Sequence, residues 1–448
     1  MNGGLSMAEM KSGYKMTEVG VIPEDWEVCE LKNHLVLLTD YDANGSFADM
    51  ASNVVTTTGN GYAWYVRATD LEQQSSLSEV KYVDEKSYRF LRKSTLYGGE
   101  VLLAKRGEIG KVYYFQMKTK RATLAPNLYL LKLKDTINSY FLFSLFKSTF
   151  GQNLLKSINA STSLGAIYKD DVKGLNILIP PFEEQASIAT ALSDVDSLIS
   201  ALTKKIEKKK AIKQGLMQQL LTGKKRLPGY EKNRESVQTE WGTIPKDWKT
   251  LSIGKCCSIK ARIGWQGLKK SEYQSSGEYV LVTGTDFLNG RIDWKSCVYV
   301  SKKRYEQDSN IQIVKHDILI TKDGTIGKVA FLDDVPCLGT LNSGIFVVRS
   351  HSEELDQSYL SKIFKSFIFD AFLESLVAGS TINHLYQKDF VHFNFPVPPT
   401  ISEQTAIANI LSDCDSEIAA LEEKRDKYKE IKQGMMQQLL TGKIRLIK

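Results

Sequence analysis

Two glycine-rich segments of the sequence contain residue types that could bind a nucleotide. They are Gly107-Glu-Ile-Gly-Lys111 and Gly324-Thr-Ile-Gly-Lys328. A phosphate-binding loop also needs a glycine five residues before the last glycine, and a serine or threonine after the lysine. Lys105 and Val112 occupy these positions in the first segment, and the second segment departs in the same way. Each segment therefore predicts a tight glycine turn between two strands.

Other catalytic patterns are incomplete as well. Asp25 followed by Glu30-Leu31-Lys32 resembles a nuclease motif, but the gap is short and the matching residues 256–258 lack both the carboxylate and the lysine. Ile179 precedes the Pro-Pro-Phe sequence where a methyltransferase needs Asn or Asp. There is no C-x-x-C pair, so zinc-ligand spacing is absent. We predict neither a catalytic nor a metal-binding residue.

Basic and amide side chains gather on the predicted loops of both halves. Arg and Lys can read guanine, and Asn and Gln can read adenine, on the major-groove edge of DNA. The formal net charge of +7 suits an anionic partner but also occurs in proteins without one. For any single residue, a solvated surface charge is the more common case.

The elements that must position these residues are found from an internal repeat. Residues 184–227 and 403–446 match at a constant offset of 219. Apolar residues recur at spacings of three and four in both copies, which is typical of a coiled coil. The predicted helices begin just after Pro-Pro pairs, end near Gly223 and Gly442, and are roughly 60 Å long. The residues expected in their shared interface are Ile188, Leu192, Val195, Ile199, Leu202, Ile407, Leu411, Cys414, Ile418 and Leu421.

A second repeated segment opens each half. Residues 18–26 and 240–248 share a Gly-x-Ile-Pro-x-Asp-Trp pattern, and strand and helix signals alternate between each opening and its long helix. We expect helices at 139–158 and 358–377. The pattern predicts an α+β fold with two similar domains in tandem, each followed by a long helix. The expected boundaries are a loose leader 1–16, a domain 17–181, a central helix 182–227, a linker 228–239, a domain 240–399 and a C-terminal helix 400–448.

Composition sets the class of protein. A 448-residue chain with 42% hydrophobic residues can bury substantial cores. The sequence contains no run of 18 apolar residues and no secretory h-region, so no membrane span or membrane partner is expected. Six cysteines without a framework of pairs favour free thiols in a reducing cytoplasm.

The combined pattern resembles the specificity subunit of type I restriction-modification enzymes. It is carried by the T-D-hydrophobic segments at Thr69 and Thr285, the two G-x-I-G-K-V segments, and a Pro-Pro pair shortly before Glu-Gln at each long helix. The resemblance extends from about Glu18 to Leu446. It implies two target-recognition domains that each read one part of a bipartite, asymmetric DNA site. It also implies that the two helices pair as an antiparallel coiled coil with pseudo-two-fold symmetry.

The resemblance further implies which partners the chain has. The specificity subunit has no catalytic activity and no cofactor of its own. Two modification subunits carry S-adenosylmethionine and methylate adenine in double-stranded DNA, and the helices dock them. Two restriction subunits add ATP- and Mg-dependent translocation and cleavage.

Residues that differ between the halves are the expected base readers, because shared residues cannot distinguish two unlike half-sites. We expect them beside the glycine turns and in the loops 161–165 and 379–384. The predicted DNA contacts are Lys105, Arg106, Lys322, Asn383, Arg67, Lys111, Lys328 and Asn342. Two other classes of function stay open on the residues alone: a self-contained DNA-modifying enzyme with an unrecognised active site, and a coiled-coil scaffold that does not bind DNA.

Overall fold

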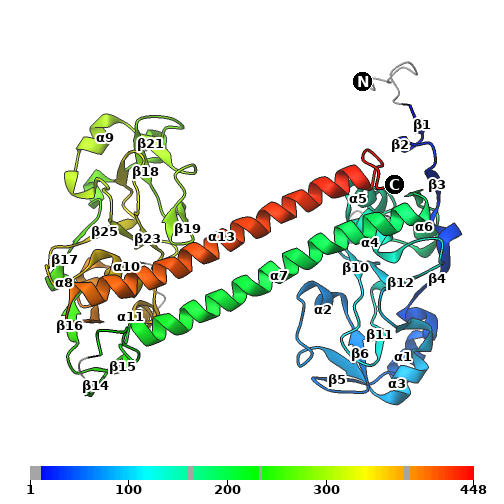
Figure 1. Ribbon diagram of the computed structural model, residues 1–448, viewed down its shortest axis with the longest axis horizontal. Helices are drawn as coiled ribbons and strands as arrows, with labels where there is room; N and C mark the ends of the chain where they lie inside the picture. Colours follow the sequence, from blue (N-terminus) through cyan, green and yellow to red (C-terminus); the bar gives the residue numbers. More distant parts are fainter. Residues whose placement is uncertain (1–11, 160–164, 232–234, 378–383, 448) are drawn as a thin grey trace. The chain divides into compact units, whose positions relative to one another are not determined.

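The structure is a computed structural model that describes residues 12–159, 165–231, 235–377 and 384–447. The chain divides into two compact units: residues 1–203 with 423–448, and residues 204–422. Two long helices, α7 (Phe182–Leu220) and α13 (Ile401–Leu439), each contribute to both units (Figure 1). Each unit therefore combines one α+β domain with parts of both helices.

The described part of the first unit contains two larger sheets and two two-stranded ones, β1-β2 and β13-β3. One is antiparallel with strand order β10-β9-β12-β4, and the other has the order β5-β7-β6-β11-β8 with β6 and β11 parallel. The strands are β1 (Tyr14–Thr17), β2 (Gly20–Pro23), β3 (Glu27–Glu30), β4 (Leu35–Asp40), β5 (Thr56–Thr58), β6 (Ala63–Val66), β7 (Lys81–Val83), β8 (Thr95–Leu96), β9 (Val101–Ala104), β10 (Val112–Tyr114), β11 (Ala122–Leu124), β12 (Leu128–Leu133) and β13 (Asn176–Ile179). The helices are α1 (Phe47–Asn53), α2 (Ala68–Glu72), α3 (Glu85–Phe90), α4 (Ser139–Lys147), α5 (Thr149–Ser157) and α6 (Lys169–Lys173).

The domain of the second unit repeats this plan. Its antiparallel sheet has the order β17-β25-β22-β23, and its smaller sheet has the order β21-β18-β24 with β18 and β24 parallel. The strands are β14 (Ser236–Thr239), β15 (Gly242–Pro245), β16 (Lys249–Ser252), β17 (Cys257–Lys260), β18 (Tyr279–Val282), β19 (Phe287–Leu288), β20 (Arg291–Ile292), β21 (Val298–Val300), β22 (Ile318–Thr321), β23 (Val329–Phe331), β24 (Leu338–Leu341), β25 (Ile345–Ser350) and β26 (Asn394–Val397). The helices are α8 (Ile253–Cys256), α9 (Lys302–Glu306), α10 (Gln357–Phe364), α11 (Phe367–Val377) and α12 (Gln387–Phe390).

The central strands are apolar on both faces because each antiparallel sheet is covered on both sides. Successive side chains of a strand point to opposite faces. In β9, Leu103 packs in the core that contains the helices, whereas Leu102 packs against the second sheet. In β22, Ile318 and Leu319 divide between two cores in the same way. The continuous apolar runs of these strands are therefore explained by a three-layer arrangement of helices, sheet and sheet.

Each predicted helix after the last central strand is divided in two. In the first unit, residues 139–158 form α4 and α5, separated by Ser148, which has extended backbone angles of φ −70° and ψ 162°. The Ser148 hydroxyl accepts a hydrogen bond from the Gly151 amide at 3.2 Å and so caps α5. The second unit has the corresponding break between α10 and α11. The prediction of one helix was wrong because apolar periodicity does not detect an internal cap.

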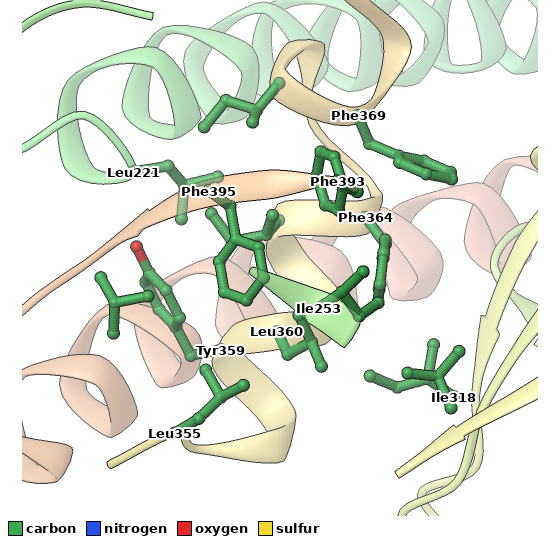
Figure 2. Packing of buried hydrophobic residues seen from close by; sticks show 14 of the residues in the cluster. Leu221, Ile253, Ile318, Leu355, Tyr359, Leu360, Phe364, Phe369, Phe393 and Phe395 are labelled. Atoms are coloured by element: carbon green, nitrogen blue, oxygen red, sulfur yellow. The ribbon is translucent and has the colours of Figure 1, made fainter. Parts of the chain in front are cut away.

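The apolar stripes of the long helices begin inside the domain cores. Ile188 and Leu192 of α7 are fully buried in the first unit, in the same cluster as Leu439 and Leu440 at the end of α13. The second unit shows the matching arrangement, in which Leu411 of α13 belongs to the cluster that contains the end of α7. Figure 2 shows part of that cluster, with the aromatic rings of α10, α11 and β26 closely packed.

The remaining stripe residues are buried to different degrees. Leu202, Ile407 and Ile418 are buried, whereas Val195, Ile199, Cys414 and Leu421 are half-buried. Within the second unit the two helices run antiparallel, because two ion pairs join them in reverse order: Lys209 to Glu417 at 2.7 Å and Lys213 to Asp415 at 2.5 Å. The predicted interface as a whole includes residues of both units and stays a prediction.

Truncation of the matched buried leucines tests how much the stripe stabilises each unit. Leu192→Ala and Leu411→Ala are each expected to lower the free energy of unfolding by about 2–5 kcal/mol, because both side chains are fully buried. Urea unfolding of the full chain measures this. Leu198→Ala is the control, since Leu198 lies in α7 but is 37% exposed. Equal effects at Leu192 and Leu198 would contradict the assignment.

Candidate nucleic-acid interface

The first glycine turn, residues 105–111, connects the antiparallel strands β9 and β10. This confirms the expected hairpin. Gly107 and Gly110 have positive φ values of 90° and 95°, which explains the two glycines. The turn is held from two sides: the Lys105 amide donates to the Asn127 carbonyl at 3.0 Å, and the Lys105 carbonyl accepts from the Ile167 amide at 3.1 Å. Three chain segments distant in sequence therefore meet at this turn.

The second glycine turn, residues 322–328, is built in the same way between β22 and β23. The Lys322 amide donates to the Gly344 carbonyl at 2.8 Å, and the Lys322 carbonyl accepts from the Leu385 amide at 2.8 Å. Gly324 and Gly327 again have positive φ. A Cβ atom on Gly327 would lie 2.4 Å from the Leu373 side chain, so α11 packs closely against this turn.

The parallel strand pairs bring further predicted residues to the same edge. The carboxyl ends of parallel strands lie at one edge of a sheet. Arg67 follows β6, and Asn127 lies three residues after the end of its parallel partner β11. Asn342 follows β24 in the second unit. Because Asn127 bonds to Lys105, and Gly344 to Lys322, this edge is continuous with each glycine turn. We call this region of each unit the turn edge.

Lys105 has a structural position at the first turn edge. Its side chain is only 9% exposed, and its ammonium lies 3.1 Å from Asp40 and 2.5 Å from Asp42. Lys169 adds a second ion pair to Asp40 at 2.8 Å. Burial alone would raise the pKa of Asp40, but the hydrogen bonds from Lys169 and Lys105 hold this pKa below its usual value. Lys105 therefore neutralises the buried carboxylate of Asp40, is also paired with the exposed Asp42, and is poorly placed for a DNA contact.

Two other predicted contacts of the first unit are also engaged by carboxylates. Arg67 forms a fork with Asp70, with Nη2 at 2.5 Å from the carboxylate, and a hydrogen bond to Asp70 raises the pKa of Arg67. The Lys111 ammonium lies between Glu108 at 2.9 Å and Glu72 at 3.0 Å, and its pKa is raised by hydrogen bonds to these two groups. Both side chains remain about one-third exposed.

Arg106 is the exposed cation of the first turn edge. It pairs through its backbone with Ala166 as an isolated β-bridge, and its side chain is exposed. Within the parts of the chain that the structure describes, its guanidinium has no carboxylate partner. Among the predicted contacts of this unit, it is the one best placed to meet a ligand.

The second turn edge differs in chemistry. Asp323 takes the place of Arg106 and pairs with His384, both through an isolated β-bridge and through a side-chain contact. The Lys322 ammonium lies 5.1 Å above the Phe346 ring, and Lys328 is half-buried. The side-chain amide of Asn342 donates a hydrogen bond through Nδ2 to the Tyr273 hydroxyl at 2.8 Å. Asn383, and most of the predicted loops 161–165 and 379–384, lie outside the described residues.

Sequence reasoning missed the contacts that join the ends of the long helices. In the first unit Arg445, just after α13, bonds to Glu184 at the start of α7 through Nε at 2.8 Å and Nη2 at 2.8 Å. Its Nη2 also donates to Asp25 at 2.6 Å, and the Trp26 indole donates to Glu184 at 2.9 Å. The Glu184 side chain is fully buried. The Arg445 hydrogen bond lowers the pKa of Asp25, and the hydrogen bond to Glu184 raises the pKa of Arg445.

The second unit contains the matching cluster with the roles of the helices exchanged. Arg226, just after α7, bonds to Glu403 at the start of α13 at 2.6 and 2.8 Å, and to Asp247 at 3.0 Å. We call each Arg–Glu–Asp group a helix-end clamp. The signal was present in the sequence, because Arg226 and Arg445 are equivalent residues of the repeat and Asp25 and Asp247 belong to the repeated opening.

The glutamine next to each clamp glutamate fixes the long helix to its domain. The Gln185 side chain accepts a hydrogen bond from the Asn138 amide at 2.9 Å, and Gln404 accepts one from the Asp356 amide at 2.8 Å. Asn138 and Asp356 are the N-cap residues of α4 and α10. The repeated Glu-Gln pair therefore has two structural roles: one residue joins two long helices, and the other joins a long helix to a domain helix.

Comparison with known proteins identifies the family. The family described as Type I restriction modification DNA specificity domain matches residues 23–214 and 245–433, so the chain belongs to this family and has two specificity domains in tandem. The chain is 29% identical to a putative type I restriction enzyme MjaX specificity subunit of Methanocaldococcus jannaschii, over 97% of both chains. It is 25% identical to the MjaVIII specificity subunit of the same organism, over 95% of this chain and 94% of that one.

A solved structure has the same fold. The S subunit of a type I restriction-modification system from M. genitalium superposes with a TM-score of 0.61 at 14% identity, over 92% of this chain and 96% of that one. The chain is thus a type I specificity subunit, the non-catalytic component of such systems. Among the helices that the structure describes, none is long and apolar enough to cross a membrane. The described side chains form no cluster of three or more His, Cys, Asp or Glu residues suited to a metal ion.

Proposed function

We propose that the two domains, residues 17–181 and 240–399, each read one half of a bipartite, asymmetric DNA site through their turn edges. The observation that carries this proposal is one backbone frame with two sets of side chains. In each unit the turn is held by the backbone amide and carbonyl of one lysine, Lys105 or Lys322. The residue after that lysine is Arg106 in one unit and Asp323 in the other. A shared frame with unlike exposed groups suits the recognition of two unlike half-sites.

The residues common to both frames support this division of roles. Asp70 and Asp286 are 2% and 3% exposed, and each bonds within its own turn. They stabilise the turn edge and are out of reach of a ligand. Sequence discrimination therefore falls to exposed groups that differ between the units. Of the predicted contacts, Arg106 is both exposed and different from its counterpart in the other unit. Lys105 is buried and stabilises the turn.

The partners follow from the same proposal. Type I specificity subunits bind DNA and assemble with other subunits. We assign to this chain two modification subunits docked on α7 and α13, and two restriction subunits in the complete complex. S-adenosylmethionine, ATP and Mg would be bound by those partners, which supply the methyl transfer and cleavage chemistry. The paired helices would set the length of the unread spacer between half-sites.

Arg106→Ala is expected to relax one base pair of one half-site and leave the other half-site unchanged. A side chain that reads a base contributes about 1–3 kcal/mol of discrimination at one position. The measurement is a map of methylated adenines in cells that express the variant with its modification subunits. If the variant instead bound all duplexes more weakly, by the same factor for every sequence, Arg106 would contact a phosphate. An unchanged map and unchanged affinity would exclude this turn from the DNA interface.

Arg89→Ala is the matched control. Arg89 is also an exposed arginine of the first unit, paired with Glu85 at 2.6 Å on α3. α3 lies well apart from α5, whose Gln152 bonds to Gly110 in the glycine turn (Figure 1). This variant should leave the methylation map unchanged, because it removes the same charge from a different part of the domain.

A further inference from the structure

Two exposed tyrosines occupy equivalent positions beside the two glycine turns. Tyr168 follows Ile167, whose amide bonds to Lys105, and Tyr386 follows Leu385, whose amide bonds to Lys322. Tyr168 is 61% exposed and Tyr386 is 54% exposed. Each residue immediately precedes a short helix, α6 or α12. The match therefore includes the backbone frame, the residue type and the exposure of the ring.

Neither tyrosine is used to stabilise its own domain through its hydroxyl. Among the residues that the structure describes, neither hydroxyl has a hydrogen-bond partner. The buried neighbour Tyr129 behaves differently, since its hydroxyl donates to the Ile167 carbonyl at 3.0 Å. The Tyr386 ring contacts His384, with ring centroids 4.5 Å apart, and the Lys388 ammonium lies 5.5 Å from its centre. The two hydroxyls are thus free to donate outward.

The chemistry of this position suits the DNA backbone. Tyrosine hydroxyls are among the groups that donate to phosphate oxygens, and such contacts fix orientation without reading sequence. Cations lie close by in both units: Arg106 on the adjacent turn in the first, and Lys388 in the second. A residue present in both units cannot distinguish two unlike half-sites, so a sequence-independent contact is the role consistent with its duplication.

We propose that Tyr168 and Tyr386 each donate a hydrogen bond to one DNA phosphate and so set the position of each half-site on its turn edge. This inference rests on the proposed function. It adds a pair of positioning residues that act alike in both domains, whereas Arg106 acts in one. Each tyrosine would fix where its half-site lies, and the neighbouring unlike side chains would then meet the bases.

The test uses the full chain with its modification subunits. It measures the affinity for a duplex that contains the site methylated by the complex, and for a duplex of unrelated sequence. Tyr168→Phe and Tyr386→Phe remove only the hydroxyl. Each variant is expected to bind both duplexes about tenfold more weakly, because one hydrogen bond to a charged acceptor is lost. Tyr97→Phe is the control, because Tyr97 is 72% exposed and precedes β9, whereas the glycine turn follows that strand. It should bind as the unaltered chain does.

Duplexes with one neutral methylphosphonate at a time then locate the contact. When the methylphosphonate replaces the phosphate that Tyr168 contacts, the unaltered chain and Tyr168→Phe should bind that duplex with equal affinity. Tyr386→Phe should likewise match the unaltered chain on the duplex with one neutral phosphate in the other half-site. Unchanged affinity of both variants, or relaxed choice of a single base, would overturn the inference. If the unaltered complex itself did not distinguish the two duplexes, the proposed function would fail instead.

Discussion

Replacing Arg445 by methionine is expected to lower the free energy of unfolding by about 3–5 kcal/mol. The change leaves the Glu184 carboxylate buried without its cation, and removal of one partner from a buried pair has effects of this size. Methionine keeps an unbranched side chain without the charge, so the guanidinium contact with the Trp26 ring, 6.0 Å from Cζ to the ring centroid, is also lost. The measurement is urea unfolding of the full chain, followed by tryptophan fluorescence. Arg226→Met should have an effect of similar size through Glu403.

A double variant separates the charge effect from a packing effect. Glu184→Met combined with Arg445→Met removes both charges, and it should be more stable than Arg445→Met alone. Lys443→Met is the control, because Lys443 is exposed and lies two residues before Arg445. If Arg445→Met were no less stable than Lys443→Met, the clamp would have no stabilising role.

The frame of the fold could be predicted because its signals are periodic or duplicated. The 219-residue offset located both long helices, and the structure has α7 and α13 as helices of 39 residues each. Gly223 and Gly442 have positive φ, as predicted for glycines that end a helix. The two glycine turns are hairpins, as their incomplete phosphate-loop pattern indicated. These features depend on local chemistry that each residue carries with it.

The features that could not be predicted depend on partners distant in sequence. Lys105 and Arg106 are adjacent basic residues, yet Lys105 is buried because Asp40 and Asp42, more than 60 residues earlier, come to the same edge. The repeat marks Arg445 and Arg226 as equivalent, but Arg445 lies 261 residues from Glu184, and no local pattern indicates which carboxylate it pairs with. The composition of a loop therefore gives candidates, and tertiary ion pairs decide which candidates remain exposed.

Two segments that were expected from their composition to be a loose leader and a linker contain strands that pair with their sequence neighbours. β1 (Tyr14–Thr17) begins inside the segment expected to be a loose leader, and it pairs with β2. β14 (Ser236–Thr239) lies inside the expected linker and pairs with β15. Both polar segments form hairpins with the repeated opening. The Tyr14 hydroxyl donates to the Gly442 carbonyl at 2.8 Å, so the first of these hairpins also contacts the end of α13.

Inserting one heptad into both long helices is expected to lengthen the unread DNA spacer by about three base pairs. Seven residues add about 10 Å of helix, and B-DNA rises about 3.4 Å per base pair. The insertion points are Thr203–Lys204 in α7 and Glu422–Glu423 in α13, where each helix passes from one compact unit to the other. A whole heptad nearly preserves the direction of the apolar stripe, so the side chains of each unit keep their local contacts. The readout is the map of methylated adenines.

Two comparisons make this result specific to helix length. Replacing the seven residues after Thr203, and the seven after Glu422, with the inserted sequence should leave the spacer unchanged, because no length is added. Insertion into α7 alone should strongly weaken binding, because only one of the two helical connections between the compact units would be lengthened. In the double insertion both half-site sequences should stay the same, because neither turn edge is altered. A spacer of the original length in that variant would show that the helices do not set the distance between the half-sites.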